Sequence, residues 1–233
     1  QIFGFAEAQA KKNAPNLYHP IACINAIRAG ALNGGEYGLD VEGQEFGKVA
    51  TSNNAKAMIH FFFALRATTK VPGVSSETKP RKIRKLAVIG GGTMGSGIAA
   101  AAMMSGITTV LKEVNQQFLD AGVDRIRGIF KSRLDKGKLK QEQFDKIMAL
   151  LKPSLTYEQF GDCDMVIEAV IEKMDLKQNI FADLEKHCSP TCILATNTST
   201  LDIVQIGAKT KAQKRIIGLH FFSPAHIMKL LEI

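Results

Sequence analysis

Short apolar runs and amphipathic stretches take turns along the second half of the chain. Runs of β-branched and other apolar residues predict strands at 86–90, 108–114, 165–171, 192–198 and 215–222. Apolar residues at helical spacing predict helices at 93–106, 116–150 (two basic helices broken near Gly137), 175–187 and 202–208. Strands this apolar that alternate with helices predict an α/β fold, whose mostly parallel sheet is covered on both faces.

The first half has a different pattern. Glycine and asparagine interrupt residues 1–50, where only one helix is predicted, near 20–31. An amphipathic helix then begins after Ser52, a predicted N-cap, and ends before Pro72. His60 falls within it and is more readily explained by packing or solvation than by ligand binding. Residues 71–85 change from Pro, Gly and Ser to basic residues, which predicts a boundary between a helical segment and the α/β domain.

Composition narrows the class of protein. The chain has 233 residues, a formal charge of +8, 45% apolar and 22% charged residues, which is globular composition with room for one large domain or one domain and part of another. Four scattered cysteines indicate a reducing compartment. The uncharged run 86–111 contains 11 Gly, Ser or Thr residues, so no membrane span is predicted. No signal peptide is visible, and the strand-like ending KLLEI leads us to expect an internal fragment of a longer protein.

A glycine motif follows the first strand of the α/β half. Gly90, Gly92 and Gly95 fit G-x-G-x-x-G between a predicted strand and a predicted helix. The first glycine permits a tight turn, the second lets the backbone approach a pyrophosphate, and the third lets the helix pack closely on the strand. The helix amino end, including Thr93 and Met94, then offers N–H groups to the phosphates. This context predicts a Rossmann-like, doubly wound dinucleotide site.

The next strand ends in an acidic residue. Glu113 stands 18 residues after Gly95, where a carboxylate accepts hydrogen bonds from an adenosine ribose. A negative charge there repels a 2′-phosphate, so NAD is favoured over NADP. FAD uses the same fingerprint and stays open as a minor alternative, as does a tight glycine turn in another α/β fold.

Four blocks in order resemble the L-3-hydroxyacyl-CoA dehydrogenase family: VIGGGTMGSGIA, VIEAVIEKMDLKQNIF, LATNTSTLDI and GLHFFSPAHIMKLLEI. With the preceding segment, the chain resembles the middle of the plant peroxisomal β-oxidation multifunctional proteins. The resemblance implies three regions. They are the end of an enoyl-CoA hydratase/isomerase (crotonase-like) half with a linker helix (1–75), a basic linker (76–85) and an NAD-binding dehydrogenase domain (86–233), whose usual C-terminal helical domain is not expected in this chain.

The resemblance implies oxidation of 3-hydroxyacyl-CoA to 3-ketoacyl-CoA with NAD. His220 is then the general base, because an imidazole titrating near neutrality suits removal of the hydroxyl proton. Glu232 is implied as its partner. Ser199 is implied to contact the substrate oxygen, and Asn197 to order the site near the nicotinamide. Without the resemblance, His220 reads as a strand-end histidine, Glu232 as a solvated charge and Ser199 or Thr200 as a helix N-cap.

Ala169, Glu172 and Lys177 match the cofactor-side positions of the family, and the alternative is an ordinary exposed Glu–Lys pair on the next helix. His187, Cys188 and Cys192 do not have the spacing of a paired zinc site, so no metal is predicted. The expected partners are the substrate and other segments of the same multifunctional chain, and the resemblance implies a peroxisomal (glyoxysomal) location. The alternative function is binding of nucleic acid or an anionic surface through the positive charge, including Lys131 and Arg133.

Overall fold

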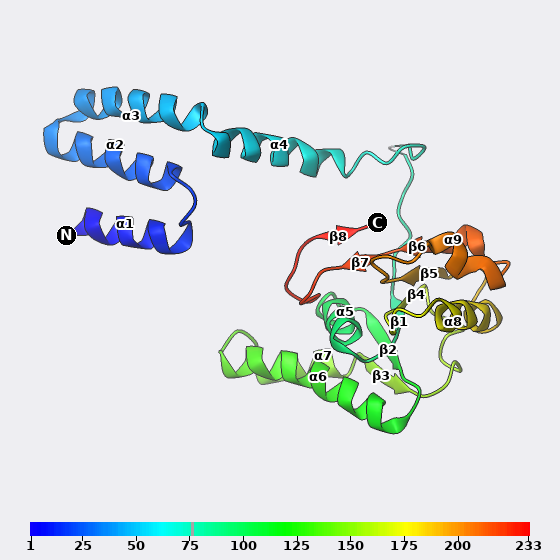
Figure 1. Ribbon diagram of the computed structural model, residues 1–233. Helices are drawn as coiled ribbons and strands as arrows, with labels where there is room; N and C mark the ends of the chain where they lie inside the picture. The colour runs from blue at the N-terminus through cyan, green and yellow to red at the C-terminus, as the bar shows by residue number, and fades with distance from the viewer. Residues whose placement is uncertain (76) are drawn as a thin grey trace. The chain divides into compact units, whose positions relative to one another are not determined.

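The computed structural model describes residues 1–75 and 77–233, which divide into two compact units, residues 1–80 and residues 81–233. Figure 1 colours the first unit from blue to cyan and the second from blue-green to red. Ser76, the first residue of the predicted basic linker, lies outside the described residues. None of the helices in residues 1–75 and 77–233 combines the length and the apolar character that a membrane span needs.

The first unit is helical. It contains α1 (Ile2–Asn13), α2 (His19–Asn33), α3 (Gly35–Ala50) and α4 (Asn53–Ala67). Helices α2 and α3 form a hairpin at Gly34, whose φ of +97° favours glycine. The two helices approach so closely that a Cβ on Gly38 would lie 2.6 Å from the Cα of Gly30. Tyr18 ties the hairpin together, because its hydroxyl donates a 2.7 Å hydrogen bond to Glu45.

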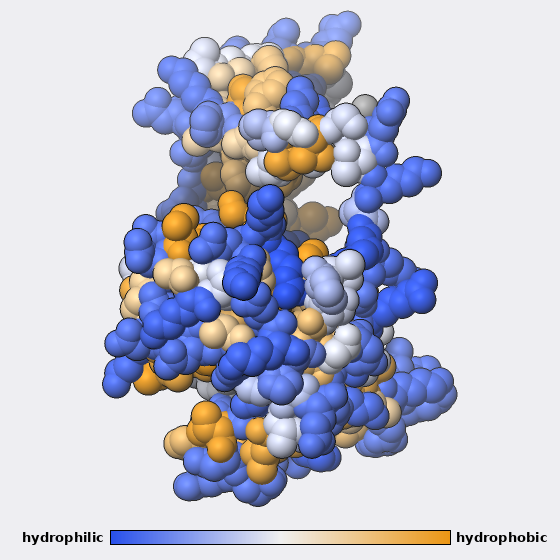
Figure 2. All heavy atoms as spheres, turned by 90° about the vertical axis from the view of Figure 1, so that its right-hand side faces the viewer, coloured by the Kyte–Doolittle hydropathy of each residue, from blue (hydrophilic) through white to orange (hydrophobic). Residues whose placement is uncertain are grey.

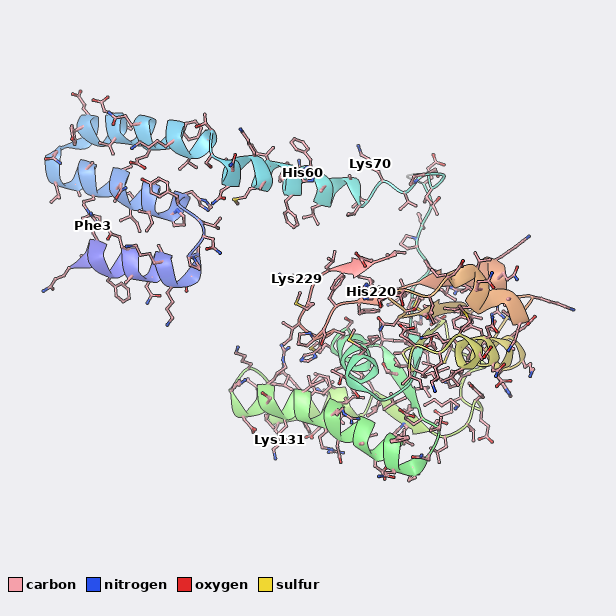
Figure 3. All side chains as sticks on the ribbon, in the orientation of Figure 1. Phe3, His60, Lys70, Lys131, His220 and Lys229 are labelled. Atoms are coloured by element: carbon pink, nitrogen blue, oxygen red, sulfur yellow. The ribbon has the colours of Figure 1, made fainter. Side chains whose placement is uncertain are left out.

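Two helices of this unit agree with the sequence prediction. Helix α2 covers the helix predicted at 20–31, and α4 follows Ser52, whose Oγ accepts a 3.1 Å hydrogen bond from the Ala55 amide. His60 is exposed on α4 (Figure 3). The sequence does not predict α1 and α3. Glycine disfavours helix, and α3 contains four glycines, but packing against α2 overrides that preference.

The second unit is built on a six-stranded sheet in the order β3-β2-β1-β4-β5-β6, with every pairing parallel. The strands are β1 (Lys85–Ile89), β2 (Thr108–Lys112), β3 (Leu151–Ser154), β4 (Met165–Glu168), β5 (Ile193–Thr196) and β6 (Ile216–Gly218). This order is that of the Rossmann-like, doubly wound fold, so the predicted fold class is confirmed.

Helices cover both faces of this sheet (Figure 1). Helices α5 (Thr93–Met104), α6 (Gln116–Asp135) and α7 (Gln141–Met148) lie on one side, and α8 (Met174–His187) and α9 (Ile203–Ile206) on the other. Successive strand residues point to opposite faces. Val88 therefore packs in the core layer of Ile98 and Phe130, while Ile89 packs in that of Phe181. In Figure 2, blue hydrophilic side chains cover most of the visible face, with orange hydrophobic residues in small groups.

Two sequence predictions need correction. Residues 116–150 form the two predicted helices, but the edge strand β3 that follows is not predicted, because Pro153 argues against a strand except at a sheet edge. The single strand predicted at 215–222 is also wrong. The chain splits into β6 and β7 (His220–Phe221), and β7 pairs antiparallel with β8 (Leu231–Glu232). The reason is the length of β5, which ends at Thr196. The Leu219 amide donates the last hydrogen bond to β5, at the carbonyl oxygen of Thr196, so the chain beyond Leu219 pairs with another strand.

Removal of the cap of α6 is expected to destabilise the second unit. Asn115 Oδ1 accepts a 2.9 Å hydrogen bond from the Phe118 amide at the start of this 20-residue helix. We expect Asn115→Ala to lower the free energy of unfolding by ~1 kcal/mol. Chemical denaturation measures this loss, with Gln117→Ala on the exposed first turn as control. Equal unfolding midpoints for the two variants would show that the Asn115 cap does not contribute to the free energy of unfolding.

Candidate active site

The strand order changes direction between β1 and β4, whose carboxyl ends lie side by side. The sheet extends from β1 toward β3 on one side and from β4 toward β6 on the other, so the connections diverge there. Open α/β sheets bind their ligands at such a point. Strand β1 ends at Ile89 and leads into the glycine motif. Strand β4 ends at Glu168, which is paired in register with Ile89.

The glycines of the motif each have a steric reason. Gly90 has a φ of +100°, and a Cβ there would lie 2.7 Å from the carbonyl oxygen of Ala169. A Cβ on Gly95 would lie 1.8 Å from the carbonyl oxygen of Gly90, so only glycine lets α5 start against the turn. Gly92 is the N-cap of α5, and apart from its own atoms and its two chain neighbours no atom of the described residues lies within 4 Å of its Cβ position. This open space at a helix amino end fits a pyrophosphate.

Two side chains outside the glycine motif form hydrogen bonds to the backbone of the turn. Ser96 Oγ and Arg125 Nη1 donate hydrogen bonds of 2.8 and 2.9 Å to the carbonyl oxygen of Gly91. Thr93 and Met94 form the first turn of α5, and Met94 packs partly against the core. The backbone N–H groups of this turn are thereby kept in place for an anion.

Glu113 follows the end of β2 and reaches the same turn. Its Oε1 accepts a 2.6 Å hydrogen bond from the Gly91 amide, and its Oε2 accepts a 3.0 Å bond from the Val114 amide. A carboxylate has about four acceptor positions, so this group is held in place with capacity for ribose hydroxyls. The structure thus brings the predicted acid and the glycine motif together.

The cofactor-side residues lie beyond β4. Ala169 lies against Gly90, and Lys177 on α8 is only 1% exposed. Lys177 Nζ lies 2.7 and 2.9 Å from the two carboxylate oxygens of Glu168 and 3.5 Å from Oε2 of Glu172. Glu172 itself is exposed. The alternative of an ordinary exposed pair is therefore wrong for Lys177, since its ammonium is buried in a polar network.

Three residues of this network are missed by the sequence analysis. Glu168 is fully buried at the end of β4, where it also accepts hydrogen bonds of 2.7 Å from the Val170 amide and the Thr196 hydroxyl. Thr198 donates a 2.9 Å bond to Glu172. The sequence does contain a signal for Glu168, which is a glutamate within the otherwise apolar strand MVIE. A charged residue is almost never fully buried unless it is paired, so a buried partner could have been expected.

His220, labelled in Figure 3, lies on β7, and it is paired in direct register with Glu232 on β8. The His220 Nδ1 atom lies 2.7 Å from Oε2 of Glu232. The histidine side chain is 27% exposed and the glutamate side chain 61%. With Nδ1 held by the carboxylate, Nε2 is the nitrogen left to exchange a proton.

Asn197 and Ser199 follow the carboxyl end of β5. Asn197 Oδ1 accepts a 2.9 Å hydrogen bond from the Phe221 amide, which fixes the backbone beside His220. Ser199 lines a cavity of about 270 Å³ together with His220 and Glu232. Ser199 and Thr200 are not the cap of the next helix. Asp202 caps α9, since its Oδ1 accepts from the Val204 and Gln205 amides, and that alternative is wrong.

His187, Cys188 and Cys192 contact aromatic and apolar side chains. The ring of His187 stacks on Tyr157 at 5.0 Å between centroids. Cys188 and Cys192 are buried in the core layer that also contains Phe181. Over residues 1–75 and 77–233, no group of three or more His, Cys, Asp or Glu side chains is arranged to hold a metal ion.

Together, the glycine turn, the acid after β2 and the His–Glu pair define a dinucleotide-dependent oxidoreductase domain. Residues 85–233 match the protein family described as 3-hydroxyacyl-CoA dehydrogenase, NAD binding domain, and the chain belongs to this family. NAD is the cofactor of this family, which removes the flavin alternative. The open space at Gly92 and the carboxylate of Glu113 fit NAD in this chain.

The whole chain also aligns with longer plant proteins. It is 54% identical to a glyoxysomal fatty acid beta-oxidation multifunctional protein of Brassica napus and 56% identical to one of Cucumis sativus. A peroxisomal fatty acid beta-oxidation multifunctional protein of Oryza sativa is 54% identical. Each alignment covers 100% of this chain and 32% of the relative, so the chain spans about a third of their length. The predicted resemblance is confirmed.

Solved structures agree with this fold. 3-Hydroxybutyryl-CoA dehydrogenase from Escherichia coli K12 superposes with a TM-score of 0.63 at 38% identity, over 65% of this chain and 32% of that one. The dehydrogenase part of multifunctional enzyme 1 from C. elegans gives 0.61 at 33% identity, over 69% and 37%. None of these plant proteins and dehydrogenases is named for nucleic-acid binding, so the alternative function gains no support from them.

Proposed function

We propose that this chain is the NAD-dependent dehydrogenase segment of a fatty-acid β-oxidation multifunctional enzyme, which oxidises 3-hydroxyacyl-CoA to 3-ketoacyl-CoA. The observation that carries the proposal is the His220–Glu232 pair. The two side chains are 2.7 Å apart, and together with Ser199 they line one cavity. This cavity lies at the edge of the sheet where ligands of this fold bind. Membership of the 3-hydroxyacyl-CoA dehydrogenase family supports the same reaction.

The chemistry of this chain's residues follows from the pair. His220 Nε2 takes the proton of the substrate hydroxyl, and the carboxylate of Glu232 stabilises the imidazolium through Nδ1. The Ser199 hydroxyl holds the substrate oxygen in the cavity. Asn197 keeps the backbone at Phe221, and with it His220, in position. When bound, NAD accepts the hydride that leaves carbon 3 of the substrate.

The cofactor is held by residues from three loops. Gly90 makes the tight turn, and its own amide donates a 2.9 Å hydrogen bond to the carbonyl oxygen of Lys112. The N–H groups of Gly92, Thr93, Met94 and Gly95 at the start of α5 would bind the pyrophosphate, and Glu113 would bind the adenosine ribose. Ala169, Glu172, Lys177 and Asn197 would hold the nicotinamide side of the cofactor. The buried position of Lys177 supports a fixed ammonium at this place.

Residues 1–75 form the end of a hydratase/isomerase half with its linker helix, and 76–85 the linker to the dehydrogenase domain at 86–233. The division of the chain after residue 80 supports this arrangement. Large apolar side chains on α4, such as Phe61 and Phe63, are exposed, which supports contact with other segments of the same multifunctional chain. The plant relatives are named as glyoxysomal or peroxisomal proteins, which supports the peroxisome or glyoxysome as the compartment.

Nicotinamide fluorescence tests the cofactor assignment first. The purified chain is titrated with NADH, and NADPH serves as the comparison. Saturable binding with a preference for NADH is the expected result, followed by NADH-dependent reduction of acetoacetyl-CoA. A folded chain that binds neither nucleotide overturns the proposal.

Glu113 is expected to set the preference between the two nucleotides. Glu113→Gln removes the charge that repels a 2′-phosphate and weakens the hydrogen bonds to ribose, since bonds to charged groups contribute ~1.5–3 kcal/mol. We expect the Kd for NADH to rise by about tenfold or more, while the Kd for NADPH falls. The same titration measures both constants, with Glu158→Gln, an exposed glutamate after β3, as control. An unchanged ratio of the two constants would remove Glu113 from the ribose site.

A further inference from the structure

Glu168 is an unusual residue for the end of a buried strand. It is 0% exposed, and its carboxylate accepts four hydrogen bonds from three groups. The donors are Val170 N at 2.7 Å, Lys177 Nζ at 2.7 and 2.9 Å, and Thr196 Oγ1 at 2.7 Å. A buried charge is costly unless its acceptor positions are filled, and here they are filled from both sides of the strand.

One set of these bonds leads toward the cofactor. The Val170 amide belongs to the loop after β4, in which Ala169 lies against Gly90. Lys177 connects Glu168 to Glu172, whose Oε2 lies 3.5 Å from the ammonium. The carboxylate of Glu168 is thus bonded directly to this loop and, through Lys177, is connected to Glu172.

The other set leads toward the proton-transfer pair. Thr196 ends β5, and the backbone carbonyl of Glu168 accepts a 2.8 Å hydrogen bond from the Asn197 amide. Asn197 Oδ1 in turn accepts from the Phe221 amide at 2.9 Å, one residue beyond His220. A single buried residue is therefore bonded to both loops that carry the predicted site.

Two hydrophobic residues in place of Glu168 and Lys177 would also satisfy packing here. Replacing buried ion pairs by apolar residues of similar volume is often neutral or stabilising, so stability alone does not account for Glu168 and Lys177. Directed hydrogen bonds supply something that apolar packing does not, which is a fixed geometry for the groups they join. Reaction rates are sensitive to such geometry, since a misplacement of about 1 Å costs ~100-fold.

We propose that Glu168 is a positioning residue that sets the cofactor loop after β4 against the Asn197–His220 loop. It acts through Lys177 and Val170 on one side and through Thr196 and Asn197 on the other. The proposal rests on the proposed dehydrogenase function, whose catalytic step it makes dependent on a residue that touches neither substrate nor cofactor.

The test compares Glu168→Gln and Thr196→Val with a matched control. Glu168→Gln keeps the size of the side chain but presents an amide NH₂ to Lys177 and Thr196. Thr196→Val removes one hydroxyl donor and keeps the shape of the residue, so it is the milder variant. Glu185→Gln is the control, because the Glu185 carboxylate also accepts from a threonine hydroxyl (Thr210, 2.6 Å) and a backbone amide (Lys211, 3.0 Å), away from the site.

Two readouts separate positioning from a structural role. In NADH-dependent reduction of acetoacetyl-CoA, we expect kcat to fall ~100-fold in Glu168→Gln and about tenfold in Thr196→Val, with little change in KM. Without any cofactor, hydrogen exchange followed by NMR should show faster exchange of the Phe221 amide in both variants. Glu185→Gln should change neither quantity.

The outcomes are distinguishable. If Glu168→Gln and Thr196→Val match Glu185→Gln in kcat and in Phe221 exchange, the positioning role is wrong although the chain is a dehydrogenase. If the unsubstituted chain neither binds NADH nor reduces acetoacetyl-CoA, the proposed function fails. In that case the Phe221 exchange rates still decide whether Glu168 holds the loop.

Discussion

Replacing His220 with glutamine is expected to lower the rate of acetoacetyl-CoA reduction by ~10²–10⁴-fold. Glutamine retains a hydrogen-bonding group of similar reach but cannot exchange a proton near neutral pH. The loss should appear in kcat, because the 2.7 Å contact with Glu232 stabilises the charge that His220 carries when protonated. Loss of NADH absorbance measures the rate.

Binding of NADH separates this chemical effect from a folding effect. His220 lies on β7, outside the glycine turn and Glu113, so the Kd for NADH should stay within about twofold of that of the unsubstituted chain. His60→Gln, on the exposed surface of α4, is the control and should leave the rate unchanged. A His220→Gln chain that keeps its full rate would mean that another group transfers the proton.

Replacing Lys177 with methionine is expected to destabilise the second unit by ~3–5 kcal/mol. The change removes the cation from a buried pair and leaves Glu168, which is 0% exposed, without a charged partner. The apolar stem of methionine still fills most of the space. Chemical denaturation followed by circular dichroism measures the loss, and Lys173→Met at an exposed position one turn earlier should change stability little.

A double variant tests the reason for that loss. Adding Glu168→Gln to Lys177→Met removes the uncompensated charge, so the double variant should be more stable than Lys177→Met alone. If the two changes simply add, the buried ion pair does not control stability at this site. The double variant would then be the least stable chain of the set.

Local patterns predicted the cofactor half of the site. Gly90, Gly92 and Gly95 are close in sequence. At Gly90 and Gly95 a Cβ would clash with the backbone, and at Gly92 the Cβ position is open space. Glu113 could be placed with them because parallel strands joined by a helix bring their carboxyl ends to one edge. The hydrogen bond from the Gly91 amide to Glu113 agrees with that placement.

Contacts between distant residues were beyond local pattern. The spacing of His220 and Glu232 does not reveal that β7 leaves the large sheet and pairs with β8 in register, and only the family resemblance paired them. Lys177 stands five residues after the exposed Glu172, yet α8 brings its ammonium to within 2.7 Å of Glu168 at the end of β4. The role of Glu168 was missed because its partners lie on α8 and β5, whereas its own strand reads as apolar.

Local sequence was sufficient to predict β1, α5 and β2, the glycine turn between them and the acid that follows β2, because these features depend on residues within one βαβ unit. Which side chains are buried, and which polar groups contact one another, became known only from the fold. Those outcomes depend on strand order and on where β5 ends, which set the neighbours of Glu168, Asn197 and His220. A buried ion pair forms only where the fold brings both charges out of water together.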